Sequence, residues 1–163
     1  MIIIVSGLPG SGKSYFAQAL AKRLEADYVN SDRVRNAEGA RGKYSTDDKL
    51  RIYQIMVERS RESVRAGKDV VVDGTFYLGA MIDLFRKLST PSTQIYFISV
   101  VADENLIKER LARPRSDSEA DYNVYLKTKK EFEPLQVPYL TLQSGKDNID
   151  EMLTTALDYI RKS

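Results

Sequence analysis

Short apolar runs alternate along the chain with stretches in which apolar residues recur at helical spacing. The apolar runs predict strands at residues 2–5, 70–72 and 95–101, and residues 27–30 and 139–142 are two further strand candidates. The helical spacing predicts helices at residues 15–24, 47–66, 78–88, 104–113 and 148–161, the second of them stopped by Gly67. Ser116 and Glu119 resemble a capping box that opens one more helix after Pro114.

This alternation predicts an α/β fold in three layers, with a five-stranded parallel sheet between two layers of helices. We expect one domain over residues 1–163, with a short helical lid at about residues 110–130. In parallel sheets, ligands lie outside the carboxyl ends of the strands. The candidate residues are therefore the polar ones that follow each strand, at residues 7–14, 31–32, 73–75 and 103.

The first of these segments has the G-x-x-x-x-G-K-[ST] pattern of a phosphate-binding loop, the Walker A motif. It follows an apolar strand and precedes an amphipathic helix, which is the context that such a loop requires. Backbone N–H groups and the helix N-terminus can bind phosphate oxygens, Lys13 can reach the β- and γ-phosphates, and Ser14 can ligate Mg²⁺. The segment predicts a site for ATP and Mg²⁺ formed by Gly7, Pro9, Gly10, Ser11, Gly12, Lys13, Ser14 and the adjacent Tyr15.

Asp73 stands at the end of three valines, a position that suits a residue of the Mg²⁺ shell. Thr75, just beyond it, is a candidate for contact with the substrate or with a metal-bound water. The alternative is that Asp73 and Gly74 simply form a turn after a strand.

Asp32 and Arg35 follow the second strand and share one helical face if a helix begins at Ser31. The chain contains no histidine, so a general base would have to be a carboxylate or, less readily, Lys or Tyr. We expect Asp32 to accept the proton of an acceptor hydroxyl and Arg35 to orient the acceptor. The alternative is a helix cap with a solvated arginine.

Arg110 and Arg113 lie on one helical face before Pro114, and Arg115 follows. Phosphoryl transfer needs positive charge on the moving phosphoryl group, which an arginine of a closing lid would supply. The alternative is a basic helix end that complements the helix dipole.

Composition indicates where the protein is located but does not identify its substrate. Lys plus Arg total 25 and Asp plus Glu total 23, a balance that neither demands nor excludes nucleic acid as a partner. Arg33, Arg35, Arg41 and Lys43 form a basic stretch that either meets nucleic acid or lies in solvent. Cysteine is absent, and the apolar start is too short for a membrane span, so we expect a cytoplasmic protein without a membrane partner.

In these residues the chain resembles the small P-loop kinase family that includes polynucleotide kinase, with zeta-toxin-like and seryl-tRNA kinases as relatives. The resemblance rests on the phosphate loop, on Asn30, Asp32 and Arg35, and on the strand that ends in Asp73-Gly74-Thr75. It implies a kinase-type P-loop fold in which Asp32 activates the acceptor hydroxyl, Arg35 contacts a substrate phosphate, and Arg113 or Arg110 contacts ATP. Tyr15, in place of a small hydroxylated residue, and the extra Gly74 depart from the family pattern.

The expected function is transfer of the γ-phosphate of Mg-ATP to a hydroxyl acceptor, which the sequence does not identify. A polynucleotide 5′-hydroxyl, a tRNA-linked group and a small metabolite are all open as acceptors. A nucleotide-dependent regulatory NTPase without an acceptor is the competing class, and a binding module without chemistry is a third. No Asn-Lys-x-Asp or Leu-Ser-Gly-Gly-Gln element occurs, which argues against a GTPase and a transporter-type ATPase.

Overall fold

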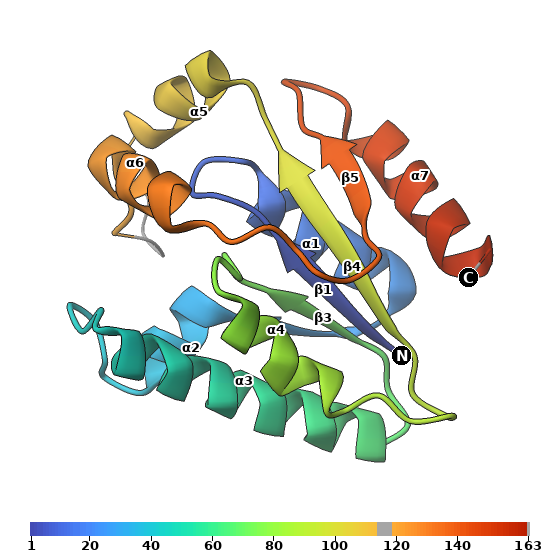
Figure 1. Cartoon of the computed structure of the whole chain (residues 1–163). Coiled ribbons are helices and arrows are strands. Elements are labelled where there is room, and N and C mark those ends of the chain that lie inside the picture. Colours follow the sequence, from blue (N-terminus) through green and yellow to red (C-terminus); the bar gives the residue numbers. More distant parts are fainter. Residues whose placement is uncertain (114–118, 163) are drawn as a thin grey trace.

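A computed structural model describes residues 1–113 and 119–162 of the chain (Figure 1). Its strands are β1 (Ile2–Ser6), β2 (Asp27–Asn30), β3 (Val70–Asp73), β4 (Ile95–Val101) and β5 (Leu140–Gln143). Its helices are α1 (Lys13–Leu24), α2 (Ser31–Ala37), α3 (Thr46–Arg65), α4 (Gly79–Arg86), α5 (Glu104–Leu111), α6 (Tyr122–Glu131) and α7 (Ile149–Lys162).

The five strands form one parallel sheet in the order β2-β3-β1-β4-β5. In this order, the connection from β1 to β2 passes over β3, and the connection from β3 to β4 passes over β1. The register places Val5 opposite Asp73, and Asp73 opposite Asn30. The carboxyl ends of β1, β2 and β3 therefore meet at one edge, where the phosphate loop begins.

Alternate residues of the central strands pack on opposite faces of the sheet. Ile3, Val5 and Ile98 pack with helices α1 and α7, whereas Ile2 and Ile4 pack with α3 and α4. Burying each such aliphatic side chain contributes about 1.5–3 kcal/mol. The result is the three-layer fold that the apolar runs predict, with the helices on both faces of the sheet (Figure 1).

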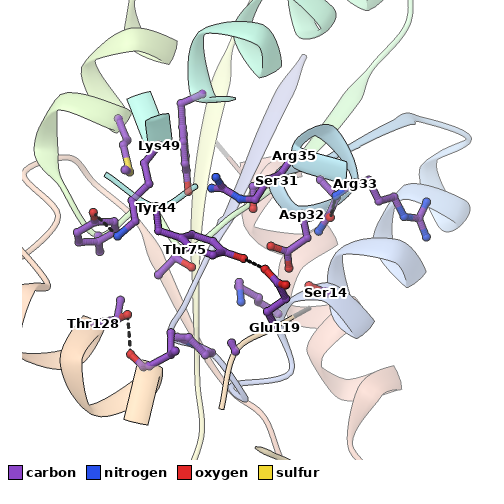
Figure 2. Close-up of a pocket in the computed structure, with 18 of the residues that line it drawn as sticks. Ser14, Ser31, Asp32, Arg33, Arg35, Tyr44, Lys49, Thr75, Glu119 and Thr128 are labelled. Atoms are coloured by element: carbon purple, nitrogen blue, oxygen red, sulfur yellow. Dashed lines mark hydrogen bonds between the residues drawn. The ribbon is translucent and has the colours of Figure 1, made fainter. Parts of the chain in front are cut away.

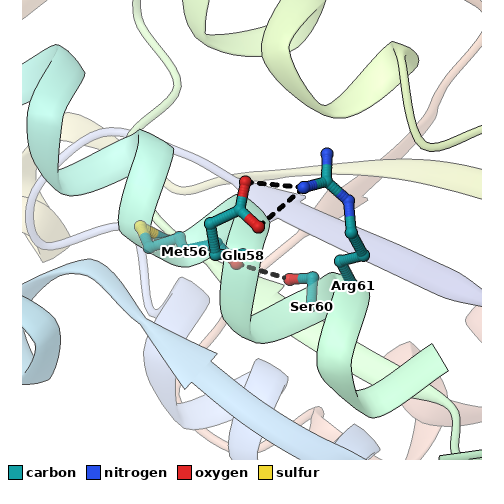
Figure 3. Close-up of polar contacts among 4 residues, drawn as sticks. All are labelled: Met56, Glu58, Ser60 and Arg61. Atoms are coloured by element: carbon teal, nitrogen blue, oxygen red, sulfur yellow. Dashed lines mark hydrogen bonds and ion pairs between the residues drawn. The ribbon is translucent and has the colours of Figure 1, made fainter. Parts of the chain in front are cut away.

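Helix α3 illustrates how a long helix presents one face to this core and the other to solvent. Ser45 and Asp48 form a complete capping box at its start. Ser60 is fully buried, and its hydroxyl donates to the carbonyl of Met56 at 2.8 Å (Figure 3). On the solvent side, Arg61 contacts both carboxylate oxygens of Glu58 at 2.7 and 2.6 Å, a pairing that stabilises a helix by about 0.2–0.5 kcal/mol.

The bounds of β2 and β4 match the predicted ranges, and the other predicted ranges differ from the observed elements by one or two residues at one or both ends. Three differences concern the site. Asp73 is the last residue of β3 instead of the first residue after it. The helix expected over residues 104–113 ends at Leu111. Ser116 lies outside the described residues, and the next described helix begins at Tyr122, where Asp121 caps it by accepting the Val124 N–H at 2.9 Å.

Candidate active site

The phosphate loop joins β1 to α1, and its glycines are required by close contacts. Gly12 has φ +88° and precedes the first residue of α1. A Cβ at Gly12 would lie 2.6 Å from Oγ of Ser144, and one at Gly10 would lie 2.9 Å from Leu111. A left-handed backbone without room for a Cβ admits only glycine. The loop thus packs closely against α5 and against the segment after β5, and it leads directly into the N-terminus of α1.

Asp73 is buried, and its two carboxylate oxygens have different surroundings. Oδ2 accepts the Tyr28 hydroxyl and the Asn30 side-chain amide, both at 2.6 Å. Oδ1 has no hydrogen-bond partner among the described residues. A buried carboxylate oxygen without a donor costs free energy unless a cation or water meets it. The carboxylate is therefore held on one side and left available on the other.

Tyr28 remains a hydrogen-bond donor to this carboxylate over the whole physiological range. Its burial, and then the nearby negative charge of Asp73, raise the pKa of the Tyr28 hydroxyl far above its ordinary value. The guanidinium of Arg33 lies over the Tyr28 ring, 5.0 Å from its centroid. Tyr28 consequently links the Asp73 carboxylate to the first turn of α2.

Asn30 makes the second link between the strand ends and α2. Its side-chain oxygen accepts the Arg33 backbone N–H at 2.9 Å and so caps the helix that carries Asp32 and Arg35. The sequence prediction of a helix opening at Ser31 is confirmed. A single side chain thus fixes both the Asp73 carboxylate and the start of the helix that bears the candidate base.

Arg35 is buried, with 6% of its surface exposed, and it makes few polar contacts for a guanidinium. Nη1 donates to the Lys43 carbonyl at 2.9 Å, and the guanidinium carbon lies 4.7 Å from the centroid of the Tyr44 ring. Nε has no partner among the described residues. Burying a cation with unsatisfied donors is costly, so this arginine is placed to receive an acceptor atom from a ligand.

A cavity of about 710 Å³ opens between α2, α3 and α6, and we call it the α3–α6 cavity. Figure 2 shows Asp32, Ser14 and Thr75 together with Tyr44 and Lys49 around it. The Tyr44 hydroxyl donates to Glu119, to which Arg41 also donates at 3.2 Å, so the loop before α3 is joined to the segment before α6. Several predicted site residues come together in its lining, namely Pro9, Lys13, Ser14, Asp32, Arg35 and Thr75.

A second cavity, of about 780 Å³, lies on the other side of the phosphate loop, and we call it the α5–α7 cavity. It is formed by the loop, by the end of α5 and by the segment between β5 and α7. Its lining includes the predicted residues Gly10, Gly12, Lys13, Ser14, Tyr15, Arg110 and Arg113. Lys13, Ser14 and Gln18 line both cavities, so the two cavities meet at the phosphate loop.

The two candidate arginines of this second cavity differ in their surroundings. Arg110 donates to the carbonyls of Gly10 and Gly145 at 3.2 and 2.8 Å and to the Ser144 hydroxyl at 3.1 Å. Burial lowers the pKa of its guanidinium. The Arg113 side chain is 79% exposed and lies 3.7 Å from Glu109. Arg110 therefore ties the phosphate loop to the segment after β5, and Arg113 is the more accessible cation.

The donors available for Mg²⁺ fit an ion that is shared with a nucleotide. Among residues 1–113 and 119–162 no three acidic, histidine or cysteine side chains cluster to hold an ion alone. Mg²⁺ typically takes one or two protein oxygens and completes its shell with phosphate oxygens and water. Asp73 Oδ1, which has no hydrogen-bond partner among the described residues, and the Ser14 hydroxyl at the start of α1 are oxygens of the kind that such an ion takes.

Gly7 and Ser11 line neither cavity and support the loop from behind. A Cβ at Gly7 would lie 2.5 Å from the Val100 carbonyl oxygen. The Ser11 backbone N–H donates to the Leu8 carbonyl at 3.1 Å, whereas its buried hydroxyl has no described partner. These contacts hold the loop on the sheet, which is a structural contribution to the site.

Sequence patterns did not indicate several residues of the site. Gln18, Tyr28 and Tyr53 lie inside regular elements, where no motif marks them as site residues. Tyr53 explains Gly74, because a Cβ there would lie 2.6 Å from the Tyr53 hydroxyl oxygen, which accepts the Phe76 N–H at 3.0 Å. The segment 144–148 carries no motif, and only its position after the last strand could have indicated a role.

Comparison with known proteins agrees with this geometry. A protein family described as AAA domain matches residues 2–135. A UPF0200 protein of Thermococcus onnurineus is 34% identical over 132 residues, 72% of this chain and 70% of the relative. A UPF0200 protein of Pyrobaculum aerophilum is 32% identical over 134 residues, 77% of this chain and 73% of the relative.

Solved structures with the same fold include several kinases. A sugar kinase from Janibacter sp. HTCC2649 has a TM-score of 0.78 at 16% identity, covering 98% of this chain and 94% of its own. A gluconokinase from Sinorhizobium meliloti 1021 has a TM-score of 0.74 at 20% identity, covering 98% and 91%. The APS kinase of Mycobacterium tuberculosis, solved with AMPPNP and APS, has a TM-score of 0.74 at 18% identity, covering 98% and 96%. The predicted kinase-type P-loop fold is therefore confirmed.

Over the described part of the chain, no helix is both long enough and apolar enough to cross a membrane.

Proposed function

The chain belongs to the AAA-domain family, and from this premise we propose that it is a kinase that transfers the γ-phosphate of Mg-ATP to a hydroxyl group of an acceptor. The observation that carries the proposal is that two cavities meet at the phosphate loop, where Lys13 and Ser14 line both. A kinase needs such a pair, because donor and acceptor must approach the transferred group from opposite sides. A switch NTPase needs a cavity for nucleotide only.

ATP is assigned to the α5–α7 cavity. Its phosphates would lie on the loop at Gly10, Gly12 and Lys13, with the nucleoside toward the segment 144–148. Asn148 holds that segment by accepting the Gly145 N–H and donating to the Gln143 carbonyl, both at 2.8 Å. Arg113 is accessible enough to reach the γ-phosphate, and the lid expected at about residues 110–130 would carry it.

The acceptor is assigned to the α3–α6 cavity, with its hydroxyl near Asp32. The hydroxyl oxygen attacks the γ-phosphorus, the bond to the bridging β–γ oxygen breaks, and ADP leaves. Asp32 takes the hydroxyl proton, and Lys13 stabilises the charge on the transferred group. Ser14 and Asp73 would hold Mg²⁺, which neutralises charge on the phosphate oxygens. Arg35, whose Nε has no partner in the part of the chain that the structure describes, would bind an anionic part of the acceptor.

The contacts favour a small acceptor over a polynucleotide. Of the four cations of the basic stretch, Arg35 is buried and Arg41 is paired with Glu119, which leaves the exposed Arg33 and Lys43 for an external phosphate backbone. The Tyr44–Glu119 contact also crosses between the loop before α3 and the segment before α6. A polynucleotide 5′-hydroxyl, which the family resemblance implies, remains the second acceptor to test.

The test is release of ADP from Mg-ATP with and without acceptors. The acceptor set comprises a fractionated cell-metabolite extract and 5′-hydroxyl oligonucleotides, and Lys13→Ala is the inactive control. We expect the metabolite extract to accelerate ADP release at least about tenfold, as general base catalysis on a bound hydroxyl requires. If no acceptor accelerates ADP release, the kinase assignment is wrong and the protein is a regulatory NTPase. Nucleotide binding without ADP release would indicate a binding module.

A further inference from the structure

Lys49 lies in the α3–α6 cavity without a carboxylate partner among the described residues. We infer that the acceptor carries an anionic group, such as a phosphate or carboxylate, which Lys49 binds at the end of the cavity remote from the reacting hydroxyl. The inference rests on the proposed function, since it gives the chemical class of the acceptor for the same cavity.

The contacts of Lys49 hold its ammonium group without neutralising it. Nζ donates to the Tyr77 hydroxyl at 3.0 Å and lies 4.7 Å from the centroid of that ring. In the described part of the chain it forms no ion pair, whereas Lys68, Lys129 and Lys146 each pair with a carboxylate. A partly buried ammonium keeps two further N–H donors and its full charge, both of which an anion would satisfy.

Helix stability does not explain a lysine at this position. Lys49 lies in the N-terminal turn of α3, directly after Asp47 and Asp48 and one turn from the cap residue Ser45. The positive end of the helix dipole disfavours cations there and favours the two acids. The residue one turn further along is Tyr53, so no acidic side chain at that spacing compensates the charge.

The place of Lys49 relative to the reacting groups sets the shape of the acceptor. In Figure 2 the Lys49 side chain extends into the cavity beside Tyr44, and Asp32 and Ser14 lie on the other side of the view. An acceptor that spans the cavity would present its hydroxyl to Asp32 while its anionic group meets Lys49. This arrangement selects against neutral alcohols, because they would leave the ammonium group buried beneath them without a partner.

A binding experiment tests the inference without requiring catalysis. Inorganic phosphate is titrated into protein whose phosphate loop is already filled with Mg-AMPPNP. The signal is the methyl resonance of ¹³C-methyl-labelled Met81, which lines the same cavity. We expect saturable shifts in the wild type, and an affinity about tenfold weaker in Lys49→Met, the effect of removing one charge-assisted hydrogen bond. Arg51→Met, an exposed cation on the same helix outside the cavity, is the matched control and should titrate like the wild type.

A transfer experiment tests the same inference on real acceptors. The metabolite extract is separated into an anionic and a neutral fraction, and each is supplied with γ-labelled ATP. We expect labelled product from the anionic fraction, with KM for that acceptor raised about tenfold by Lys49→Met.

Identical phosphate titrations in the wild type and Lys49→Met, or labelled product from the neutral fraction, would overturn the inference. If neither fraction yields labelled product, the proposed kinase function fails, and the phosphate titration still decides whether Lys49 binds an anion.

Discussion

The side-chain amide of Asn30 donates a 2.6 Å hydrogen bond to Oδ2 of Asp73, while the side-chain oxygen of the same residue caps the helix that carries Asp32. Tyr28 donates to the same oxygen of Asp73, again at 2.6 Å. The proposed metal acid and the proposed general base are thus positioned by one small group of side chains. This relationship leads to the first prediction.

Loss of either donor to Asp73 should raise the Mg²⁺ concentration that AMPPNP binding requires. Asn30→Ser removes the amide donor but keeps a good cap for α2, and Tyr28→Phe removes the hydroxyl alone. Loss of a residue that orients a metal ligand typically lowers metal affinity about 10–100-fold. Each variant should therefore raise the Mg²⁺ midpoint by up to about that factor, and Asp73→Asn should raise it more. Midpoints equal to that of the wild type in both donor variants would show that Asp73 does not act on Mg²⁺.

Gly12→Ala should abolish nucleotide binding because the added Cβ would clash with neighbouring side chains, in addition to straining the backbone. The added Cβ would lie 2.6 Å from the Ser144 hydroxyl and 3.0 Å from Nη1 of Arg110. Gly42→Ala is the matched control, since Gly42 has φ +79° and a Cβ added there would meet no atom of the described residues within 4 Å. We expect AMPPNP affinity to fall below detection only in Gly12→Ala, measured by fluorescence competition. Equal effects of the two substitutions would contradict the packing explanation.

Arg113→Ala should lower turnover without changing thermal stability, because its side chain is exposed and, among the described residues, its ion-pair partner Glu109 lies at 3.7 Å. Arg110→Ala should lower both, since three hydrogen bonds to the Gly10, Ser144 and Gly145 segments are lost at a cost of about 1–3 kcal/mol each where a buried partner is left unsatisfied. Steady-state kinetics and thermal denaturation separate the two effects. Wild-type turnover in Arg113→Ala would leave this arginine as a solvated helix-end residue.

Asp32→Asn should reduce the rate of phosphoryl transfer by about 10²–10⁴-fold, the usual contribution of a general base. It keeps the shape of the side chain, so the affinity for Mg-AMPPNP should stay within about twofold of the wild type, as expected when no nucleotide contact is removed. Asp47→Asn, an exposed acid of α3 outside both cavities, is the control. Normal turnover in Asp32→Asn, or loss of nucleotide binding, would contradict the assignment of the base.

The sequence is sufficient to predict the sheet and the phosphate loop because both depend on local patterns. The range 95–101 coincides with β4, whose mostly apolar run is typical of a buried parallel strand, and the range 27–30 coincides with β2 although that strand begins and ends with a polar residue. The contacts of Arg110 with the segment after β5, and of Tyr44 with Glu119, join residues 34 or more positions apart. Such pairings depend on how helices settle on the sheet, and no local pattern encodes them. The same holds for Tyr53 and Gly74.

The AAA-domain match alone does not distinguish a kinase from a nucleotide-dependent switch. The two cavities favour a kinase because the second one gives room for an acceptor beside the phosphate loop. The Lys49 site and the buried Arg35 both favour an anionic acceptor, which a switch would not need. The distinction therefore turns on where the γ-phosphate goes.

The most direct measurement is the distribution of a γ-phosphate label between organic ester and inorganic phosphate after a single turnover, with the anionic metabolite fraction present. Transfer between the two cavities predicts that most of the label appears as ester, and that ester formation disappears in Lys13→Ala and falls by at least about 10²-fold in Asp32→Asn. Label recovered only as inorganic phosphate, at a rate independent of the metabolite fraction, would contradict the account.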